Sequence, residues 1–264
     1  MEMRSAASDE CPDFNPTNRT TPGESAIAFN SGIRYTKLPS LAGRLWPVTH
    51  YSDFKMVAEQ LVQIARWASR MGWAPATSTN YSVRLPDDAT PAYCAITSSG
   101  VDKSTIEVAH ILAVDQHGGS IDADGQKPSA ETPLHLLLYR TMGAGAVLHT
   151  HSHSAALLSQ LARDEGRVLL SGWELLKGLS GIDTHEVEVS LPVFPNSQDM
   201  QALSTHVEQS LSRERPCYGF LLAGHGLYAW GEDLPEAKRH LEVFEYLLQC
   251  QREVTLHGHS ANTR

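Results

Sequence analysis

Apolar side chains recur at helical spacing along several stretches of the chain, and these stretches predict its helices. Between residues 52 and 71 they follow one face of a helix, and Gly72 supplies the stop. The predicted stripe consists of Val57, Leu61, Ile64, Ala68 and Met71. It is better explained as a surface packed against a core than as a functional one. Further helices are predicted from Ser129, after His153 and from Pro235.

Short apolar or alternating runs bounded by turn residues predict the strands. Such runs cover residues 81–85, 93–97, 111–114, 144–148 and 186–193. Two more strands are predicted between residues 220 and 230, where they meet at Gly224-His225-Gly226. The chain beyond residue 52 therefore contains both strands and helices, and spacing alone does not give their arrangement.

The length of the chain and the distribution of this pattern favour one domain. With 264 residues, a single large core is expected, and two small domains are the alternative. Residues 1–51 are rich in Ser, Thr, Pro and Asn and lack sustained periodicity, which predicts a flexible or loosely packed N-terminal arm. We therefore expect the domain to span residues 52–256 and a solvated tail to span residues 257–264.

Charge and cysteine usage narrow the class of partner and the compartment. The formal net charge of −9 argues against general nucleic-acid binding and against an anionic membrane surface. No apolar run approaches the ~20 residues needed to span a bilayer, and the start of the chain lacks a secretory pattern. The four cysteines show no paired spacing and are expected to be reduced thiols. These features predict a cytoplasmic protein, and a local positive pocket for a small anion remains open.

The strand that begins at Ala144 ends in His149-Thr-His151, which is a candidate metal site. Alternate side chains of a strand share a face, so the two histidines are expected roughly 6.6 Å apart along one side. Two imidazoles at that separation can converge on one ion. His153 would lie roughly 13 Å from His149 on a continued strand, which is too far for the same tetrahedron. The alternative is that the pair is only polar decoration of a strand end.

A third metal ligand must then come from elsewhere, and His225 is the candidate. It lies at a tight turn between two predicted strands, with a glycine on either side. Glycine lets the backbone bend and approach another segment closely. A histidine without a role would be unusual there, and this favours His225 as the partner of the pair.

Two carboxylates are candidates for proton transfer. Glu131 is in the first turn of the helix that leads into the histidine strand, where the helix dipole alone could explain a carboxylate. The functional alternative is an acid or base beside whatever that strand binds. Glu174 follows Trp173 among apolar residues, an environment that would raise the pKa of its carboxyl group. The alternative for Glu174 is a half-exposed side chain.

The chain resembles the class II aldolase and adducin family over roughly residues 53–254. The resemblance starts from His149-Thr-His151 together with Gly-His225-Gly. It is carried further by Gly72-Trp73-Ala-Pro-Ala-Thr77, Ser78-Thr-Asn80-Tyr81-Ser82, Lys127-Pro-Ser129-Ala-Glu131-Thr132, Gly143-Ala-Gly-Ala-Val-Leu-His149-Thr-His151-Ser152 and Gly224-His225-Gly-Leu-Tyr-Ala-Trp230-Gly231. Within the family these motifs are similar to those of the members that dehydrate 5-methylthioribulose 1-phosphate in methionine salvage.

The resemblance implies a fold, a cofactor and an assembly. The fold is a three-layer α/β/α domain with a central, largely antiparallel sheet. One zinc ion per subunit would be held by His149, His151 and His225, and three neutral imidazoles would leave zinc an open position for chemistry. The family forms tetramers with sites near subunit interfaces, so a homotetramer is expected.

The resemblance also implies roles for individual residues. Glu174 matches the position of the acid–base residue of the dehydratases, and Glu131 matches that of the aldolases, which gives it a secondary role here. The residues expected to bind the substrate phosphate share two hydroxyl-rich turns and their surroundings, namely Asn80, Thr97, Ser98, Gly100, Lys103 and Ser129. One departure is Thr79, because the aldolases usually have glycine before the asparagine of this turn.

Two other functions fit the same family. An aldolase or 4-epimerase of a sugar phosphate would share the metal and the enediolate chemistry, so the histidines cannot separate it from a dehydratase. A non-catalytic interaction module, like the adducin heads, is the second alternative. Such modules can lose the ligands, whereas this chain keeps all three histidines and both carboxylates.

Overall fold

The computed structural model describes residues 27–28, 34–37, 45–89, 91–121, 125–211 and 217–261, and within these ranges it describes side chains from Asp53 to His257. Eight strands form one central sheet in the order β6-β5-β4-β7-β11-β10-β9-β8. Its strands are β4 (Asn80–Arg84), β5 (Cys94–Thr97), β6 (Ile111–Val114), β7 (Ala146–Thr150), β8 (Arg167–Ser171), β9 (Glu188–Phe194), β10 (Gly219–Leu222) and β11 (Gly226–Gly231). All neighbouring strands are antiparallel except β9 and β10. The expectation of a largely antiparallel sheet is confirmed, with one parallel pair.

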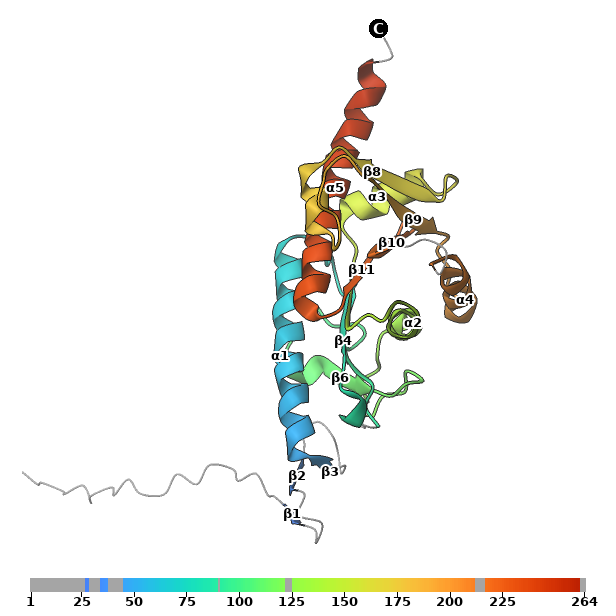
Figure 1. Cartoon of the computed structure of the whole chain (residues 1–264). Helices are drawn as coiled ribbons and strands as arrows, with labels where there is room; N and C mark the ends of the chain where they lie inside the picture. Colours follow the sequence, from blue (N-terminus) through green and yellow to red (C-terminus); the bar gives the residue numbers. More distant parts are fainter. Residues whose placement is uncertain are drawn as a thin grey trace, which may run out of the picture.

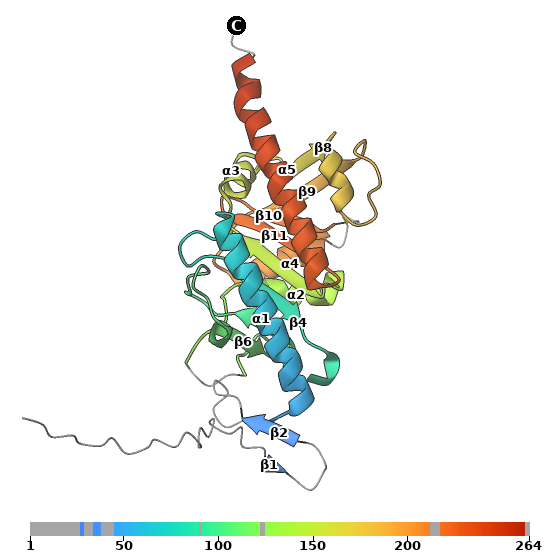
Figure 2. The same cartoon turned by 90° about the vertical axis from the view of Figure 1, so that its left-hand side faces the viewer.

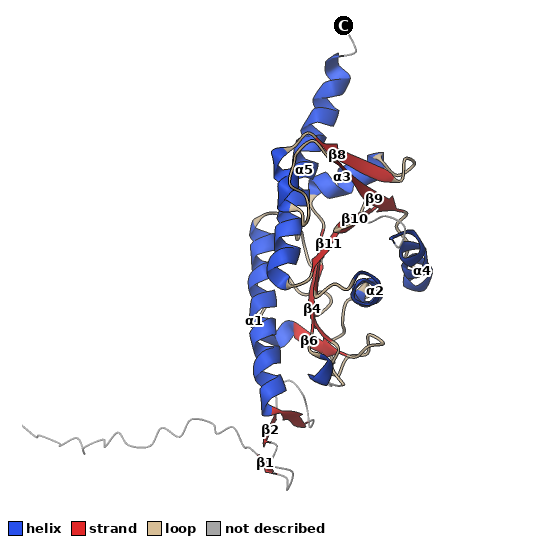
Figure 3. Ribbon diagram, viewed as in Figure 1, coloured by secondary structure: helices blue, strands red, loops and turns tan. Residues whose placement is uncertain are grey.

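Helices cover both faces of this sheet, as Figures 1 and 3 show. The long helices α1 (Val48–Arg70) and α5 (Leu234–Ala261) lie on one face, and α2 (Thr132–Met142) and α4 (Met200–Leu211) lie on the other. In Figure 2, α1 and α5 lie in front of the sheet. Helix α3 (His153–Leu161) packs against α5. The three-layer α/β/α architecture is therefore confirmed.

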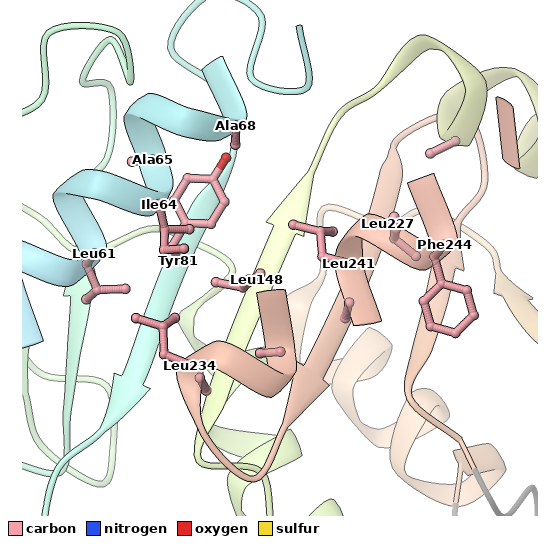
Figure 4. Close-up of a cluster of buried hydrophobic side chains, with 14 of the residues drawn as sticks. Leu61, Ile64, Ala65, Ala68, Tyr81, Leu148, Leu227, Leu234, Leu241 and Phe244 are labelled. Atoms are coloured by element: carbon pink, nitrogen blue, oxygen red, sulfur yellow. The ribbon is translucent and has the colours of Figure 1, made fainter. Parts of the chain in front are cut away.

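The two faces have separate cores because strand side chains alternate between them. Leu148 and Leu227 belong to the core under α1 and α5, which Figure 4 shows together with Leu241 and Phe244 of α5. Val147 and Tyr228, one position away, belong to the core under α2 and α4. His149 follows Val147 by two positions, so the first histidine of the pair lies on the α2 face.

The apolar stripe of the first helix is confirmed with one exception. Leu61 and Ala68 are fully buried, and α1 begins at Val48, four residues before the predicted start. Met71 was predicted as part of this stripe and is wrong, because α1 ends at Arg70 and the Met71 side chain is 50% exposed. Gly72 adopts a φ of +76°, the left-handed conformation that a chain reversal after a helix requires.

Near both ends of the chain the structure contains secondary structure that was not predicted from the sequence. A small sheet of β1 (Ile27–Ala28), β2 (Arg34–Lys37) and β3 (Leu45–Pro47) lies within the stretch predicted as an arm, whose other residues lie outside the described ranges up to α1. Helix α5 continues to Ala261, past the predicted start of the tail, and residues 262–264 are likewise outside. Among the described helices, none combines the length and apolar character of a membrane span.

A chain that begins at Val48 is expected to fold and to keep its activity. The reason is that α1 starts at Val48 and all residues of the candidate site follow it. Because β2 and β3 contact α1, a small drop in melting temperature is expected. Circular dichroism melting and turnover, compared with the full chain, are the measurements. An insoluble or inactive product would show that the removed segment completes the core or an interface.

Candidate metal centre

Three histidines and a carboxylate converge at the end of β7. The Nε2 atom of His149 lies 2.7 Å from Nε2 of His151 and 3.4 Å from Nε2 of His225. The carboxylate of Glu131 lies 3.5 Å from His149 Nε2 and 3.3 Å from His225 Nε2. One ligand atom from each of the four residues lies within 4.8 Å of the other three. The structure therefore brings together all three predicted metal ligands and one of the two predicted carboxylates.

The backbone fixes the orientation of His149. Its Nδ1 atom lies 2.9 Å from the carbonyl oxygen of Leu227 on the neighbouring strand β11. A carbonyl oxygen can only accept, so Nδ1 carries the proton and Nε2 keeps its lone pair. The His149 ring also stacks on Tyr228, with centroids 3.9 Å apart. His149 is thus held as a ready metal ligand of defined tautomer.

Glycines allow the hairpin that carries His225 to reach β7. Gly224 has a φ of +65°, in the left-handed region that side-chain-bearing residues seldom adopt. A Cβ atom on Gly226 would lie 2.0 Å from the carbonyl oxygen of Thr150, so no other residue fits there without backbone movement. The glycines on either side of His225 are therefore required for the turn and for the close approach, as the sequence indicated.

Burial and the neighbouring imidazoles keep His149 and His151 neutral. Burial, together with the neighbouring His225, holds the pKa of His149 well below its usual value. Burial and the two neighbouring imidazoles lower the pKa of His151 to about 3. Neutral imidazoles are what a metal ion binds, and nitrogen lone pairs that face one another, as those of His149 and His151 do, repel unless a cation lies between them. The donor set therefore fits a transition metal ion held by His149, His151 and His225, with Glu131 beside it.

Glu131 begins helix α2 at the N-cap position but does not cap it. Its side chain turns toward the histidines, and Oε2 accepts a hydrogen bond of 2.6 Å from Nδ2 of Asn80. Only 13% of the side chain is exposed. The helix dipole is therefore not the sole explanation for this carboxylate, because its oxygens face the ligand atoms of the metal centre.

A cavity of about 260 Å³ opens beside the cluster. Its lining is mostly hydroxyl, amide and imidazole groups, from Thr77, Ser78, Thr79, Asn80, Ser99, Gly100, Ser129, Ala130, Glu131, His151, Asn196, Ser197, Gln198, Met200 and His225. Such a surface suits a small, hydroxylated, anionic molecule. Three of the residues predicted to bind phosphate, Asn80, Gly100 and Ser129, are in this lining.

The other three predicted phosphate residues lie outside the cavity wall. Thr97 is buried, and its hydroxyl accepts from the backbone N–H of Tyr81. Ser98 lines a neighbouring open pocket instead. Lys103 is fully buried and donates to the carbonyl oxygen of Val101 at 2.8 Å, and burial lowers the pKa of its ammonium group to about 8. Their phosphate contacts stay predictions.

The loop between β9 and α4 supplies one wall of the cavity and was not predicted from the sequence. Asn196, Ser197 and Gln198 follow a proline and form no recognised motif, and Met200 begins α4. They reach the centre because β9 pairs in parallel with β10, which places the end of β9 beside the end of β10 where the His225 turn begins. That pairing is a tertiary feature, so no local signal could have identified the loop.

Glu174 lies in a different environment from the one expected. It begins a short 3₁₀ helix, Glu174–Gly178, with 70% of its side chain exposed, and it pairs with Lys177 and, at 3.5 Å, with His185. The Lys177 ammonium lowers the pKa of this carboxyl group, so the expected rise is wrong. The apolar neighbours do not bury it, since Leu175 is itself 40% exposed. Glu174 belongs neither to the metal cluster nor to the cavity lining of a single chain.

Comparisons with known proteins place this chain among relatives of one family. Residues 59–252 match the family model described as class II aldolase and adducin N-terminal domain. The methylthioribulose-1-phosphate dehydratase of Sorangium cellulosum is 44% identical over 203 residues, which are 76% of this chain and 94% of that protein. The enzyme of that name from Stenotrophomonas maltophilia K279a is 46% identical over 204 residues, 76% and 93% of the two chains.

Solved structures with low sequence identity share the fold. YgbL from Escherichia coli, described as a putative aldolase/epimerase/decarboxylase, aligns with a TM-score of 0.63 at 24% identity and covers 76% of this chain and 90% of its own. An L-fuculose 1-phosphate aldolase aligns with a TM-score of 0.62 at 23% identity, over 77% and 88%. These likenesses support the architecture described above.

Proposed function

This chain belongs to the class II aldolase and adducin family, and we propose that it is a zinc-dependent methylthioribulose-1-phosphate dehydratase of methionine salvage. The observation that carries the proposal is the convergence of three imidazoles and Glu131 beside a cavity, in a chain so similar to those dehydratases. The substrate would be 5-methylthio-D-ribulose 1-phosphate. The products would be 5-methylthio-2,3-dioxopentyl phosphate and water.

Zinc bound by His149, His151 and His225 would supply Lewis-acid polarisation of the C2 carbonyl group, which makes the proton on C3 easier to remove. A carboxylate takes that proton, and the electron pair of the C3–H bond forms a C3–C4 double bond as the C4 hydroxyl leaves. A proton delivered to that hydroxyl lets it depart as water. The enol that remains takes a proton on C4 and releases the proton of its C3 hydroxyl, which gives the diketone. The protein must therefore supply a carboxyl group that both accepts and donates a proton.

Glu131 and Glu174 are the two carboxyl groups proposed for this task. Glu131 lies against the proposed metal ligands, and its Oε2 atom accepts a hydrogen bond from the Asn80 amide. Glu174 matches the acid–base position of the dehydratases and is exposed, so it could enter a cavity only on another subunit. We propose Glu174 as the main acid–base group, acting across an interface of a homotetramer, with Glu131 in a secondary role.

The proposed phosphate site surrounds the cavity mouth. The Ser129 hydroxyl, the Asn80 amide and the backbone of Gly100 line it. Thr97, Ser98 and Lys103 lie outside the cavity lining, and Lys103 is included because its ammonium group would provide positive charge near the phosphate. We further propose a cytoplasmic location, where thiols stay reduced. The described cysteines are free thiols, which agrees with this proposal.

Turnover of the methylthio substrate tests the function. We expect the zinc-loaded protein to generate the absorbance of a diketone with loss of one water per substrate. Aldol cleavage between C3 and C4 would instead release dihydroxyacetone phosphate, which a coupled dehydrogenase detects, and 4-epimerisation would give a new sugar phosphate visible by proton NMR. Either alternative product without the diketone would replace the dehydratase by another enzyme of the family. If the metal-loaded protein does not convert this substrate into any of these products, the interaction module would be favoured.

A further inference from the structure

A continuous chain of hydrogen bonds runs from the metal centre into the core on the α2 side of the sheet. It starts at Glu131, whose Oε2 accepts from Asn80 Nδ2 at 2.6 Å. Asn80 Oδ1 lies 2.5 Å from Nε2 of His135, and His135 Nδ1 lies 2.6 Å from the hydroxyl of Ser82. The Ser82 hydroxyl lies 2.5 Å from the hydroxyl of Tyr139. The last four side chains are at most 3% exposed.

The chemistry of the groups sets one direction for this chain. An ionised carboxylate only accepts, so Asn80 must present its NH₂ group to Glu131 and its carbonyl oxygen to His135. His135 then donates from Nε2 and, since burial lowers its pKa to about 4 and keeps it neutral, accepts at Nδ1. Ser82 donates its only hydroxyl proton to Nδ1 of His135. The Tyr139 hydroxyl must therefore donate to the Ser82 oxygen. In this order each of the four hydrogen bonds has one donor and one acceptor.

The second N–H of Asn80 is also committed. It lies 3.0 Å from the hydroxyl of Ser129, another residue of the cavity lining. Asn80 therefore orients two cavity groups at once, and it can do so only with its amide in this orientation. A reversed amide would place its carbonyl oxygen against the Glu131 carboxylate and leave an NH₂ group facing the N–H of His135.

We infer that His135 is a positioning residue, which locks the Asn80 amide and through it aims the Glu131 carboxylate and the Ser129 hydroxyl at the cavity. His135 touches neither the cavity nor the metal ligand atoms, so its role is indirect. It lies one helical turn after Glu131 on α2, and this spacing lets one helix carry both the carboxylate and the group that orients its partner. The inference rests on the proposed function for its effect on turnover.

A simpler explanation is that His135 only fills space in the core. It is fully buried beside Tyr228, with ring centroids 5.9 Å apart, and a residue of similar size could pack there. An apolar residue would, however, leave the Asn80 carbonyl oxygen and the Ser82 hydroxyl without their partners. Packing alone therefore does not explain a histidine at this position.

A pair of substitutions separates the two roles. In His135→Gln the side-chain amide nitrogen can take the place of Nε2 and still donate to Asn80. In His135→Asn the shorter side chain reaches only the place of Nδ1, so contact with Ser82 survives and contact with Asn80 is lost. If His135 positions Asn80, we expect kcat to fall by ~10- to 100-fold in His135→Asn, as for a misplaced catalytic group. The fall in His135→Gln should be several times smaller, with metal content unchanged in both.

Melting temperatures of both variants provide the control. Losses of kcat that follow the losses of melting temperature, with no advantage for Gln over Asn, would overturn the inference and leave His135 as a packing residue. Because the Ser82 contact is kept only in the Asn variant, a stability effect alone would not favour Gln in activity.

A second measurement needs no activity and no variant that folds. In protein labelled with ¹⁵N-histidine, long-range proton–nitrogen spectra distinguish the two neutral tautomers, and the His135 signals are assigned by their loss in His135→Gln or, if that fails to fold, by their coupling along α2. We expect His135 to be neutral with its proton on Nε2 at pH 7. A proton on Nδ1, or a charged ring, would refute the chain of hydrogen bonds even if the proposed dehydratase activity were present. An inactive wild type with the expected tautomer would count against the proposed function alone.

Discussion

The His225→Ala variant is expected to lose nearly all bound metal and measurable turnover while it keeps its fold. Removing one of three imidazoles leaves the ion with two protein nitrogens and should weaken its binding by more than the ~10- to 100-fold typical of second-sphere changes. The fold should survive because the His225 ring lies in a turn, and no described residue hydrogen-bonds its Nδ1. Metal per chain by elemental analysis and melting by circular dichroism are the measurements.

The control for this variant is His153→Ala. His153 lies two positions beyond His151, but it starts helix α3 and its Nδ1 faces Arg252 at 3.1 Å. It should therefore bind full metal and turn over normally. If His225→Ala kept its metal and rate while His153→Ala lost them, the triad would be wrong and His153 would replace His225. Equal loss in both would point to a general effect on the end of β7.

The residues around the triad show why the metal centre could be predicted from sequence. Alternation along β7 was sufficient to place His149 and His151 on one face, and Thr150 between them does point the other way, where it donates to Glu245 of α5 at 2.5 Å. The glycines beside His225 indicated that the backbone of this turn lies close to another segment, and Gly226 does lie against the backbone of Thr150. The alternation of side chains along a strand and the conformational freedom of glycine depend only on residues close together in the chain. Both can therefore be read from a single sequence.

The parts that sequence reasoning missed depend on contacts between distant segments. The wall from Asn196 to Gln198 exists because β9 pairs in parallel with β10. His135 reads as one more buried position of an apolar helix until its partners from β4 are placed beside it. For Glu174 the sequence left two environments open, an apolar one that raises its pKa and a half-exposed one, and the structure shows an exposed carboxylate paired with Lys177. Neither strand order nor the exposure of a short 3₁₀ helix can be obtained from spacing.

Glu245 of α5 is buried against Thr150, the residue of β7 that points away from the two histidines. It is 2% exposed, burial raises its pKa to about 7, and its contact with Thr150 ties the strand of the metal ligands to α5. His149 is thus held by the Leu227 carbonyl oxygen of the neighbouring strand, and Thr150 beside it is held by the Glu245 carboxyl group. A centre fixed in this way keeps its ligands in place before the ion binds.

The Glu174→Gln variant is expected to bind metal and substrate nearly as the parent does, with turnover at least ~10²-fold lower. Glutamine keeps the shape and can donate hydrogen bonds, but it cannot exchange a proton. In the single chain the Lys177 ammonium lowers the pKa of the Glu174 carboxyl group, which favours the ionised form that would accept the C3 proton. Once protonated, it can return that proton to the departing C4 hydroxyl.

The matched variant is Glu131→Gln, which changes a carboxylate that contacts the metal ligands directly. It should also lower activity, but with lower metal occupancy or a higher KM, because it removes the negative charge beside the proposed metal ligands and the carboxylate to which Asn80 donates. Turnover is therefore compared with metal occupancy in both variants. Near-normal turnover in Glu174→Gln beside an inactive, metal-loaded Glu131→Gln would move the proton transfer to Glu131 and favour an aldolase-like enzyme.

Mixing two inactive variants tests whether Glu174 acts on another subunit. Glu174→Gln keeps the triad, whereas His225→Ala keeps Glu174, so an interface between them would contain one complete set of groups. Subunits unfolded together and refolded as a mixture should then regain turnover that neither variant has alone. A mixture as inactive as its parents, in assemblies shown by mass spectrometry to contain both variants, would confine the chemistry to one chain. Glu131 is then the carboxylate already at the metal centre, and the 70% exposed Glu174 could not be the acid–base group.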